Sequence, residues 1–277
     1  MSPQTEGSGP RLTQALALGL LHGPAELLPI SSSAHVALVP WLLGWDYGEL
    51  DPELRKEFEV ALHAGTVAAL VIGLRGEAGD FVRHRNPRLI ALLGLASAPA
   101  ALAGYTLERQ IERRVGTPAT IAAGLLTGGL ALAWADRTPE SRASGDASAR
   151  DALWLGFAQA CALVPGVSRS GATLAAARRR GFTRDDARRL SRHVALPVVA
   201  GAALLKAGRM WRRGLAPGAA APLAVGLVAS FGSTFVSARL ISSLEGEGSF
   251  APYAAYRIAL AAAVLRRLTA QPTTMAT

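Results

Sequence analysis

The sequence predicts an all-α protein with about six membrane-spanning helices, and two observations lead to this prediction. Half of the 277 residues are hydrophobic and only 18% are charged, whereas soluble domains carry about 25% charged residues. Six apolar runs lie between bunches of charge, at residues 58–74, 89–107, 118–135, 193–208, 219–236 and 251–265. Roughly 17–25 apolar helical residues span a bilayer core of ~30 Å. A soluble helical bundle would need polar faces, and these runs have none.

The net charge of +9 comes mainly from arginine. In a soluble chain it would indicate nucleic-acid binding. Here the arginines cluster at the ends of apolar runs, as at residues 83–88, 178–180 and 212–213, where basic side chains meet anionic lipid headgroups. We therefore expect the lipid bilayer as a partner and no nucleic acid. The sequence leaves open which side each terminus faces and whether the chain forms a homodimer.

A polar stretch at residues 137–151 divides this single membrane domain, residues 1–277, into two similar halves. Its composition of Ser, Gly, Pro and mixed charge is typical of a loop or flexible linker. The halves, roughly 11–136 and 152–268, contain GLLHGPAELLPISSSAH from Gly19 and GFAQACALVPGVSRSGAT from Gly156. Three full spans per half would insert the second copy upside down, so we expect two inverted repeats. Chance similarity between alanine-rich helices is the alternative.

Both similar segments contain a residue pattern that interrupts a helix. Pro29 lacks an amide donor, and the serines that follow offer hydroxyls that compete for backbone hydrogen bonds. Pro165 and Gly166 have the same effect before the second serine cluster. Irregular backbone at membrane depth is tolerated only where protein buries it or water reaches it. We therefore expect two re-entrant helix hairpins whose tips point toward each other.

The tips carry polar side chains that favour anion binding. Arg169 lies between Ser168 and Ser170, and a guanidinium binds phosphate oxygens in a two-pronged manner. Free amides at a helix N-terminus near Gly171 would add donors. The alternative is that Arg169 only extends to lipid headgroups.

The first tip carries groups suited to proton transfer or metal binding. His22 and Glu26 are four residues apart and share a helix face, a spacing that suits a metal or a proton-handling pair. Glu26 could instead pair structurally with Arg169. Ser32 and His35 are three residues apart, close enough for the histidine to activate the serine hydroxyl.

The segments ELLPISSSAH and PGVSRSGAT resemble the two signature motifs of the BacA-type undecaprenyl pyrophosphate phosphatases. The resemblance covers nearly the whole chain, including FEVALHAGT at residues 58–66 and the closing PYAAYRIALAAAV. It implies six spanning helices with two re-entrant helix pairs in inverted repeats. It also implies hydrolysis of undecaprenyl pyrophosphate to the monophosphate, which recycles the carrier lipid of cell-wall synthesis. The site would open to the outer face of a bacterial cytoplasmic (inner) membrane.

The resemblance also implies roles for individual residues. Ser32 matches the proposed nucleophile, His35 the proton carrier and Arg169 the arginine that holds the diphosphate, while Glu26 matches the second carboxylate of an ExxxE pattern. The resemblance places further polar side chains around the substrate: Ser31, Ser33, Ser168, Ser170 and Thr173.

Three departures from the family pattern affect the expected cofactor. His22 replaces the first carboxylate of ExxxE, His63 stands where the family usually carries Gln, and Arg192-His193 replaces apolar or aromatic residues. The resemblance implies Mg²⁺ or Ca²⁺, whereas an imidazole at position 22 also admits Mn²⁺. We expect Glu26 and His22 to be the metal ligands. The alternative is that His22 only donates a hydrogen bond to Glu26 or to the substrate.

Two other functions fit the same architecture. Inverted repeats with broken helices also occur in transporters, so the chain could move a polyprenyl phosphate across the bilayer. It could also cleave a different prenyl diphosphate. The combination of Ser32, His35 and Glu26 favours hydrolysis over transport, because a binding-only site needs no activated serine.

Overall fold

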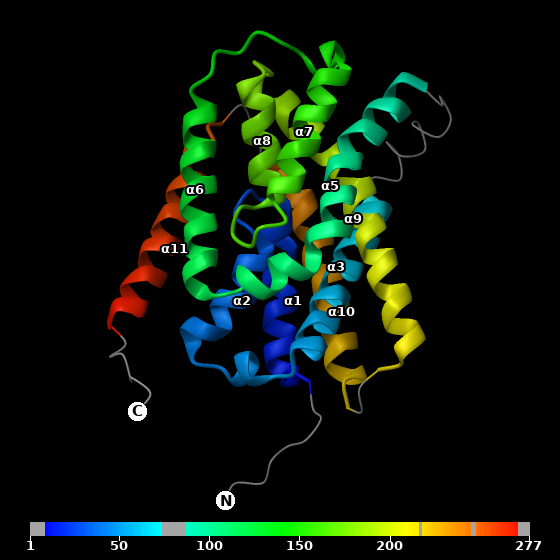
Figure 1. Ribbon diagram of the computed structural model, residues 1–277, viewed down its shortest axis with the longest axis vertical. Coiled ribbons are helices and arrows are strands. Elements are labelled where there is room, and N and C mark those ends of the chain that lie inside the picture. The colour runs from blue at the N-terminus through cyan, green and yellow to red at the C-terminus, as the bar shows by residue number, and fades with distance from the viewer. Residues whose placement is uncertain (1–8, 74–86, 216–217, 245–247, 271–277) are drawn as a thin grey trace, which may run out of the picture. The chain divides into compact units, whose positions relative to one another are not determined.

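The structure is a computed structural model that describes residues 9–73, 87–215, 218–244 and 248–270. The described residues form helices and no β-strand, as the composition predicts (Figure 1). The α-helices are α1 (Leu12–Leu27), α2 (Ser32–Leu43), α3 (Pro52–Gly73), α5 (Pro87–Arg114), α6 (Pro118–Asp136), α7 (Ala149–Cys161), α8 (Arg169–Arg179), α9 (Arg184–Arg213), α10 (Ala220–Leu244) and α11 (Ala251–Ala270). Leu74, which ends the first predicted run, and residues 83–86 of a basic cluster lie outside the described residues.

Four of the described helices are long and apolar enough to cross a membrane. They are α5 over Pro87–Leu107, α6, α9, and α10 over Ala220–Ile241, and they account for four of the six predicted runs. The other two runs form α3 and α11, of 22 and 20 residues, which carry more charge. The all-helical fold and its apolar helices therefore indicate a multi-pass membrane protein, as expected.

The helices belong to two compact units, and each unit has its own packing. One unit is built around α1, α3 and α10. The other contains α6, α7, α8 and α11 together with the segment Leu28–Ala34.

Glycines allow the helices of the first unit to approach closely. A Cβ atom on Gly19 of α1 would lie 2.6 Å from the Cβ of Ala229 on α10. A Cβ on Gly65 of α3 would collide with the Leu227 carbonyl oxygen and the Ser230 hydroxyl of α10. The Ser230 hydroxyl donates a hydrogen bond of 2.8 Å to the Leu62 carbonyl. Small residues and interhelical hydrogen bonds of this kind stabilise helix pairs in a membrane, where no hydrophobic driving force acts.

In the second unit, ion pairs anchor the polar loop at residues 137–151. Arg142 donates two hydrogen bonds to the buried Asp151 carboxylate, at 3.0 and 2.7 Å, and Arg180 donates one at 2.6 Å. Ser148 caps the N-terminus of α7 and also donates to Asp151. Burial raises the pKa of Asp151, but the hydrogen bonds from Arg142, Ser148 and Arg180 outweigh it and hold that pKa well below its usual range. The stretch is thus a loop tied to α7 and α8 by charge.

We predict that Gly65→Ala destabilises the protein by about 1–3 kcal/mol, because the new methyl group collides with the backbone of α10. Gly232→Ala, on α10, is the matched control, since nothing lies within 4 Å of its added Cβ. Alanine favours a helix over glycine by up to ~1 kcal/mol, so the control should unfold at the wild-type temperature or above it. The thermal unfolding midpoint of both variants in detergent measures the difference, and equal midpoints would contradict this packing.

Candidate functional site

The two predicted helix interruptions are present, and their local geometry is the same. The first break lies between the end of α1 at Leu27 and the start of α2, and the second between the end of α7 at Cys161 and the start of α8. Ser31 and Ser168 precede the second helix of each pair, with φ of 75° and 67°. They are the non-glycine residues with positive φ in the part of the chain that the structure describes. Such a conformation costs about 1–3 kcal/mol and is retained only where its surroundings enforce it.

The two serines cap the helices that follow them. The Ser31 hydroxyl accepts from the Ala34 amide at 3.4 Å, and the Ser168 hydroxyl accepts from the Gly171 amide at 3.2 Å. Each capping hydroxyl also lies 3.3 Å from the hydroxyl two residues on, that of Ser33 or Ser170. The first turns of α2 and α8 therefore combine hydroxyls with amides at the positive end of a helix dipole, an arrangement that favours anions.

A buried arginine connects both breaks. The Arg257 side chain on α11 is fully buried, and its guanidinium donates to the carbonyls of Pro29 at 3.4 Å, Gly166 at 3.0 Å and Val167 at 2.7 Å. Pro29 belongs to the first break, and Gly166 and Val167 belong to the second. Carbonyl groups that a helix break leaves without partners are costly in apolar surroundings, and one side chain supplies donors to both breaks.

Sequence reasoning did not identify Arg257 as a site residue. A signal was available, because Arg257 is an ionisable residue inside the apolar run at 251–265, and such residues mark functional or structural sites by default. What the sequence could not supply was the partner, since Pro29 lies 228 residues away along the chain.

Of the four predicted catalytic residues, Ser32, His35 and Arg169 occupy the first turns of the two short helices, whereas Glu26 lies on α1. Ser32 and His35 are both buried, and their spacing on α2 puts them on one helix face. Arg169 is the first residue of α8 and is partly exposed. The Ser170 hydroxyl donates to the Leu28 carbonyl at 3.1 Å.

Thr173, predicted to bind substrate, has a fully buried side chain whose hydroxyl lies 2.6 Å from that of Ser191. It also donates to the Arg169 carbonyl at 2.9 Å. These contacts join α8 to α9.

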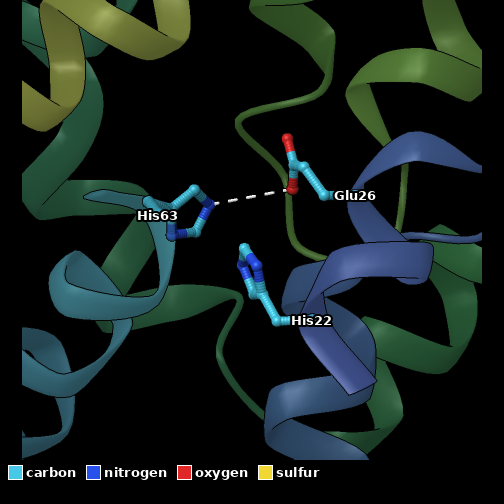
Figure 2. A group of neighbouring side chains, drawn as sticks. All are labelled: His22, Glu26 and His63. Carbon is cyan, nitrogen blue, oxygen red and sulfur yellow. Dashed lines mark ion pairs between the residues drawn. The ribbon is translucent and has the colours of Figure 1, made fainter. Parts of the chain in front are cut away.

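A second polar group lies in the first unit, where His22 and Glu26 of α1 face His63 of α3 (Figure 2). One possible ligand atom from each side chain lies within 4.8 Å of the others. His63 Nε2 lies 3.9 Å from a Glu26 carboxylate oxygen, and the two imidazole centroids are 4.6 Å apart. The expected pairing of His22 with Glu26 is thus present, and the structure adds His63. The sequence marked His63 only as a departure from a family pattern, because spacing along the chain does not show that α3 packs against α1.

The family model and the relatives that match this chain agree with one another. Residues 15–263 match the family model described as bacitracin resistance protein BacA. The chain is 41% identical to the undecaprenyl-diphosphatase of Geobacter sulfurreducens over 94% of this chain and 99% of that protein. It is 41% identical to the undecaprenyl-diphosphatase of Pelobacter propionicus over 92% and 96%. That of Rubrobacter xylanophilus is 36% identical over 91% and 97%.

We predict that Arg257→Met destabilises the protein by on the order of 2 kcal/mol. Each carbonyl left without a donor costs about 1–3 kcal/mol, and relief from burying a charge offsets part of that loss. Arg266→Met is the matched control, because Arg266 is an exposed arginine on the same helix. The readout is the thermal unfolding midpoint in detergent. A wild-type midpoint for Arg257→Met would show that the guanidinium does not stabilise the breaks.

Proposed function

This chain belongs to the BacA family, and from that membership we propose that it hydrolyses undecaprenyl diphosphate to undecaprenyl phosphate and inorganic phosphate. The reaction would recycle the carrier lipid of cell-wall synthesis. The observation that carries the proposal is that relatives named undecaprenyl-diphosphatase match more than 90% of the chain. The segments that carry the motif resemblance also coincide with the two serine-capped helix breaks.

The second break is proposed to bind the diphosphate. Arg169 begins α8, so its guanidinium extends from the helix end where amides and dipole already favour an anion. Ser168 and Ser170 would add hydroxyl donors, as would Ser31 and Ser33 at the first break. Ser170 and Thr173 would act more weakly than the others, because their hydroxyls already donate to backbone carbonyls within the protein.

The first break is proposed to supply the nucleophile. The Ser32 hydroxyl would attack the terminal phosphorus, and the bond between this phosphorus and the bridging oxygen would break. Undecaprenyl phosphate would leave, and water would then release inorganic phosphate from the serine. His35, one helical turn further along α2, would take the serine proton and return a proton in the second step.

A divalent cation is proposed to assist, held by Glu26 and His22. When bound, it would neutralise charge on the diphosphate and polarise its oxygens. One carboxylate and imidazole nitrogens form a donor set that fits a divalent ion. Mg²⁺ and Ca²⁺, which the family resemblance implies, prefer oxygen ligands, whereas Mn²⁺ accepts nitrogen more readily.

We further propose that residues 11–136 and 152–268 are inverted repeats, each with a re-entrant helix pair, in the cytoplasmic membrane of a bacterium. The matching φ angles and hydroxyl contacts at the two breaks support this proposal. The substrate side of the site would open to the outer face of that membrane.

Phosphate release tests the function directly. Protein purified in detergent should release inorganic phosphate from undecaprenyl diphosphate, and a parallel reaction with farnesyl diphosphate reports the dependence on chain length. A protein that binds the lipid without releasing phosphate would be a transporter or a binding protein. Preference for farnesyl diphosphate would assign another prenyl substrate.

We predict that Arg169→Lys lowers phosphate release about 30- to 1000-fold although the charge is kept. A lysine cannot form the two-pronged contact, whose loss at a desolvated site should cost on the order of 2–4 kcal/mol. Arg189→Lys on α9 is the control, since Arg189 is an exposed arginine outside both breaks. Activity of Arg169→Lys within threefold of wild type would exclude the two-pronged role.

We predict that Ser32→Ala and His35→Ala each abolish most turnover, and that the double variant is scarcely worse than either single one. Groups that act as one nucleophile–base unit show such non-additive losses. Binding of the intact lipid should persist in all three variants. Fully additive losses would instead indicate attack by water, with His35 acting separately from Ser32.

A further inference from the structure

We propose that His22, Glu26 and His63 form a two-histidine, one-carboxylate site that selects a first-row transition ion such as Mn²⁺, Co²⁺ or Zn²⁺ over Mg²⁺ and Ca²⁺. His63 thereby becomes a third metal ligand. The role of the ion in phosphate release rests on the proposed function, whereas the binding of the ion does not.

The hydrogen bond of His63 fixes which ring nitrogen faces the group. His63 Nδ1 lies 2.8 Å from the Glu59 backbone carbonyl. A carbonyl oxygen only accepts, so Nδ1 must carry a hydrogen. In the neutral ring, Nε2 therefore has no hydrogen and presents a lone pair, and this is the atom that lies 3.9 Å from the Glu26 carboxylate. In Figure 2 the His63 ring is turned toward Glu26.

His22 is oriented through a buried chain of hydroxyls. Its Nδ1 lies 3.0 Å from the Thr66 hydroxyl, which in turn lies 3.0 Å from the Thr234 hydroxyl. Both threonine side chains are fully buried. Histidines that bind metals usually donate their second ring nitrogen to such a partner, which fixes the tautomer and the ring orientation.

The remaining nitrogen of His22 is the second observation that indicates a ligand. His22 Nε2 is buried and has no hydrogen-bond partner, although the side chain is only 1% exposed. A buried polar atom without a partner is costly. Donation from Nδ1 to Thr66 would leave Nε2 with a lone pair, as at His63.

One cation satisfies all three side chains at once. Two nitrogen lone pairs and a carboxylate that face one another repel unless a positive centre lies between them. A proton on His63 Nε2 would pair with Glu26 but would leave His22 Nε2 without a partner. A second proton on His22 would place two imidazolium rings 4.6 Å apart beside one carboxylate, at the cost of burying an uncompensated charge.

The donor atoms decide which class of ion fits. Imidazole suits Zn²⁺, Cu²⁺, Fe²⁺ and Ni²⁺, and Co²⁺ and Mn²⁺ belong to the same first-row series. Two histidines with one carboxylate leave further coordination positions open. Mg²⁺ and Ca²⁺ require oxygen ligands. Metal–ligand bonds of ~2.0–2.2 Å separate ligand atoms by about 3–3.5 Å. The possible ligand atoms lie within 4.8 Å of one another. Side-chain rotations that move these atoms by about an ångström would bring them to the distances that a bound ion requires.

The open positions connect this site to the proposed function. The vacant coordination positions would accept water or phosphate oxygens, as a phosphatase requires. The His22→Glu and His63→Gln changes would together restore the residues that the family resemblance leads one to expect. The double variant should therefore shift the preference for metals toward Mg²⁺ and Ca²⁺.

The test is direct binding of Co²⁺ to the full chain, purified without a histidine tag and stripped by chelator. Visible absorption reports ligand type and coordination, and mass spectrometry reports metal content. We expect one Co²⁺ per chain that a large excess of Mg²⁺ or Ca²⁺ does not displace. Thr66→Val should weaken binding about 10- to 100-fold by removing the partner of His22, and His63→Gln should weaken it further. His193→Gln, which removes a histidine outside the group, should bind as wild type does.

Wild-type protein that binds no Co²⁺, or loses it to Mg²⁺, would overturn the inference, as would undiminished binding in His63→Gln. Should His63→Gln fail to fold, the wild-type titration and Thr66→Val decide the question. Phosphate release from the same samples separates the two proposals. Full activity of stripped protein with Mg²⁺ alone, without Co²⁺ binding, would refute the proposed metal site and support the proposed phosphatase activity. Specific Co²⁺ binding without phosphate release from any prenyl diphosphate would refute the proposed phosphatase activity and support the proposed metal site.

Discussion

The hydrogen bonds from Arg257 to the two helix breaks are the interaction on which the structure around the breaks depends. In apolar surroundings a helix satisfies the hydrogen-bonding groups of its backbone, because its amides and carbonyls pair with one another within the helix. A break removes those partners over several residues. Here a guanidinium on α11 donates to carbonyls of both breaks, and serine hydroxyls accept from the amides that begin α2 and α8.

The same breaks also place the N-termini of two helices inside the protein. A helix that begins inside the protein presents its unpaired amides and the positive end of its dipole where a spanning helix would present only side chains. Ser31 and Ser168 hold strained backbone conformations to make this possible. Room for the guanidinium comes from Gly128 and Gly171, since a Cβ at either position would collide with it. Two short capped helices of this kind favour the binding of an anion.

The sequence predicted what depends on local patterns and missed what depends on distant packing. Apolar runs predicted the long helices, although α5 continues to Arg114 beyond the expected end at residue 107. Prolines and serines predicted both breaks, and the spacing of His22 and Glu26 predicted their shared face. Arg257 and His63 were not predicted as site residues, because the partners of Arg257 lie in the two helix breaks and that of His63 lies on α1, all of them distant in sequence. The two cases differ in kind: an arginine inside an apolar run could have drawn attention to position 257, while nothing local distinguishes His63 from a structural histidine.

The serine-capped breaks and the group of His22, Glu26 and His63 have different physical explanations. The serine-capped breaks are explained by backbone requirements and would be needed for folding even without a substrate. The group of His22, Glu26 and His63 is not explained in that way, since an apolar packing of α1 against α3 would avoid a buried nitrogen without a partner. A cost of this kind is retained where function requires it.

Hydrogen–deuterium exchange shows whether one guanidinium holds both breaks. Exchange would be followed for peptides that cover residues 28–34 and 162–171 in wild type and in Arg257→Met. We expect both segments to lose protection together in the variant, although they are more than 120 residues apart in sequence, while α10 keeps its protection. Loss of protection at one break alone, or at neither, would contradict this expectation.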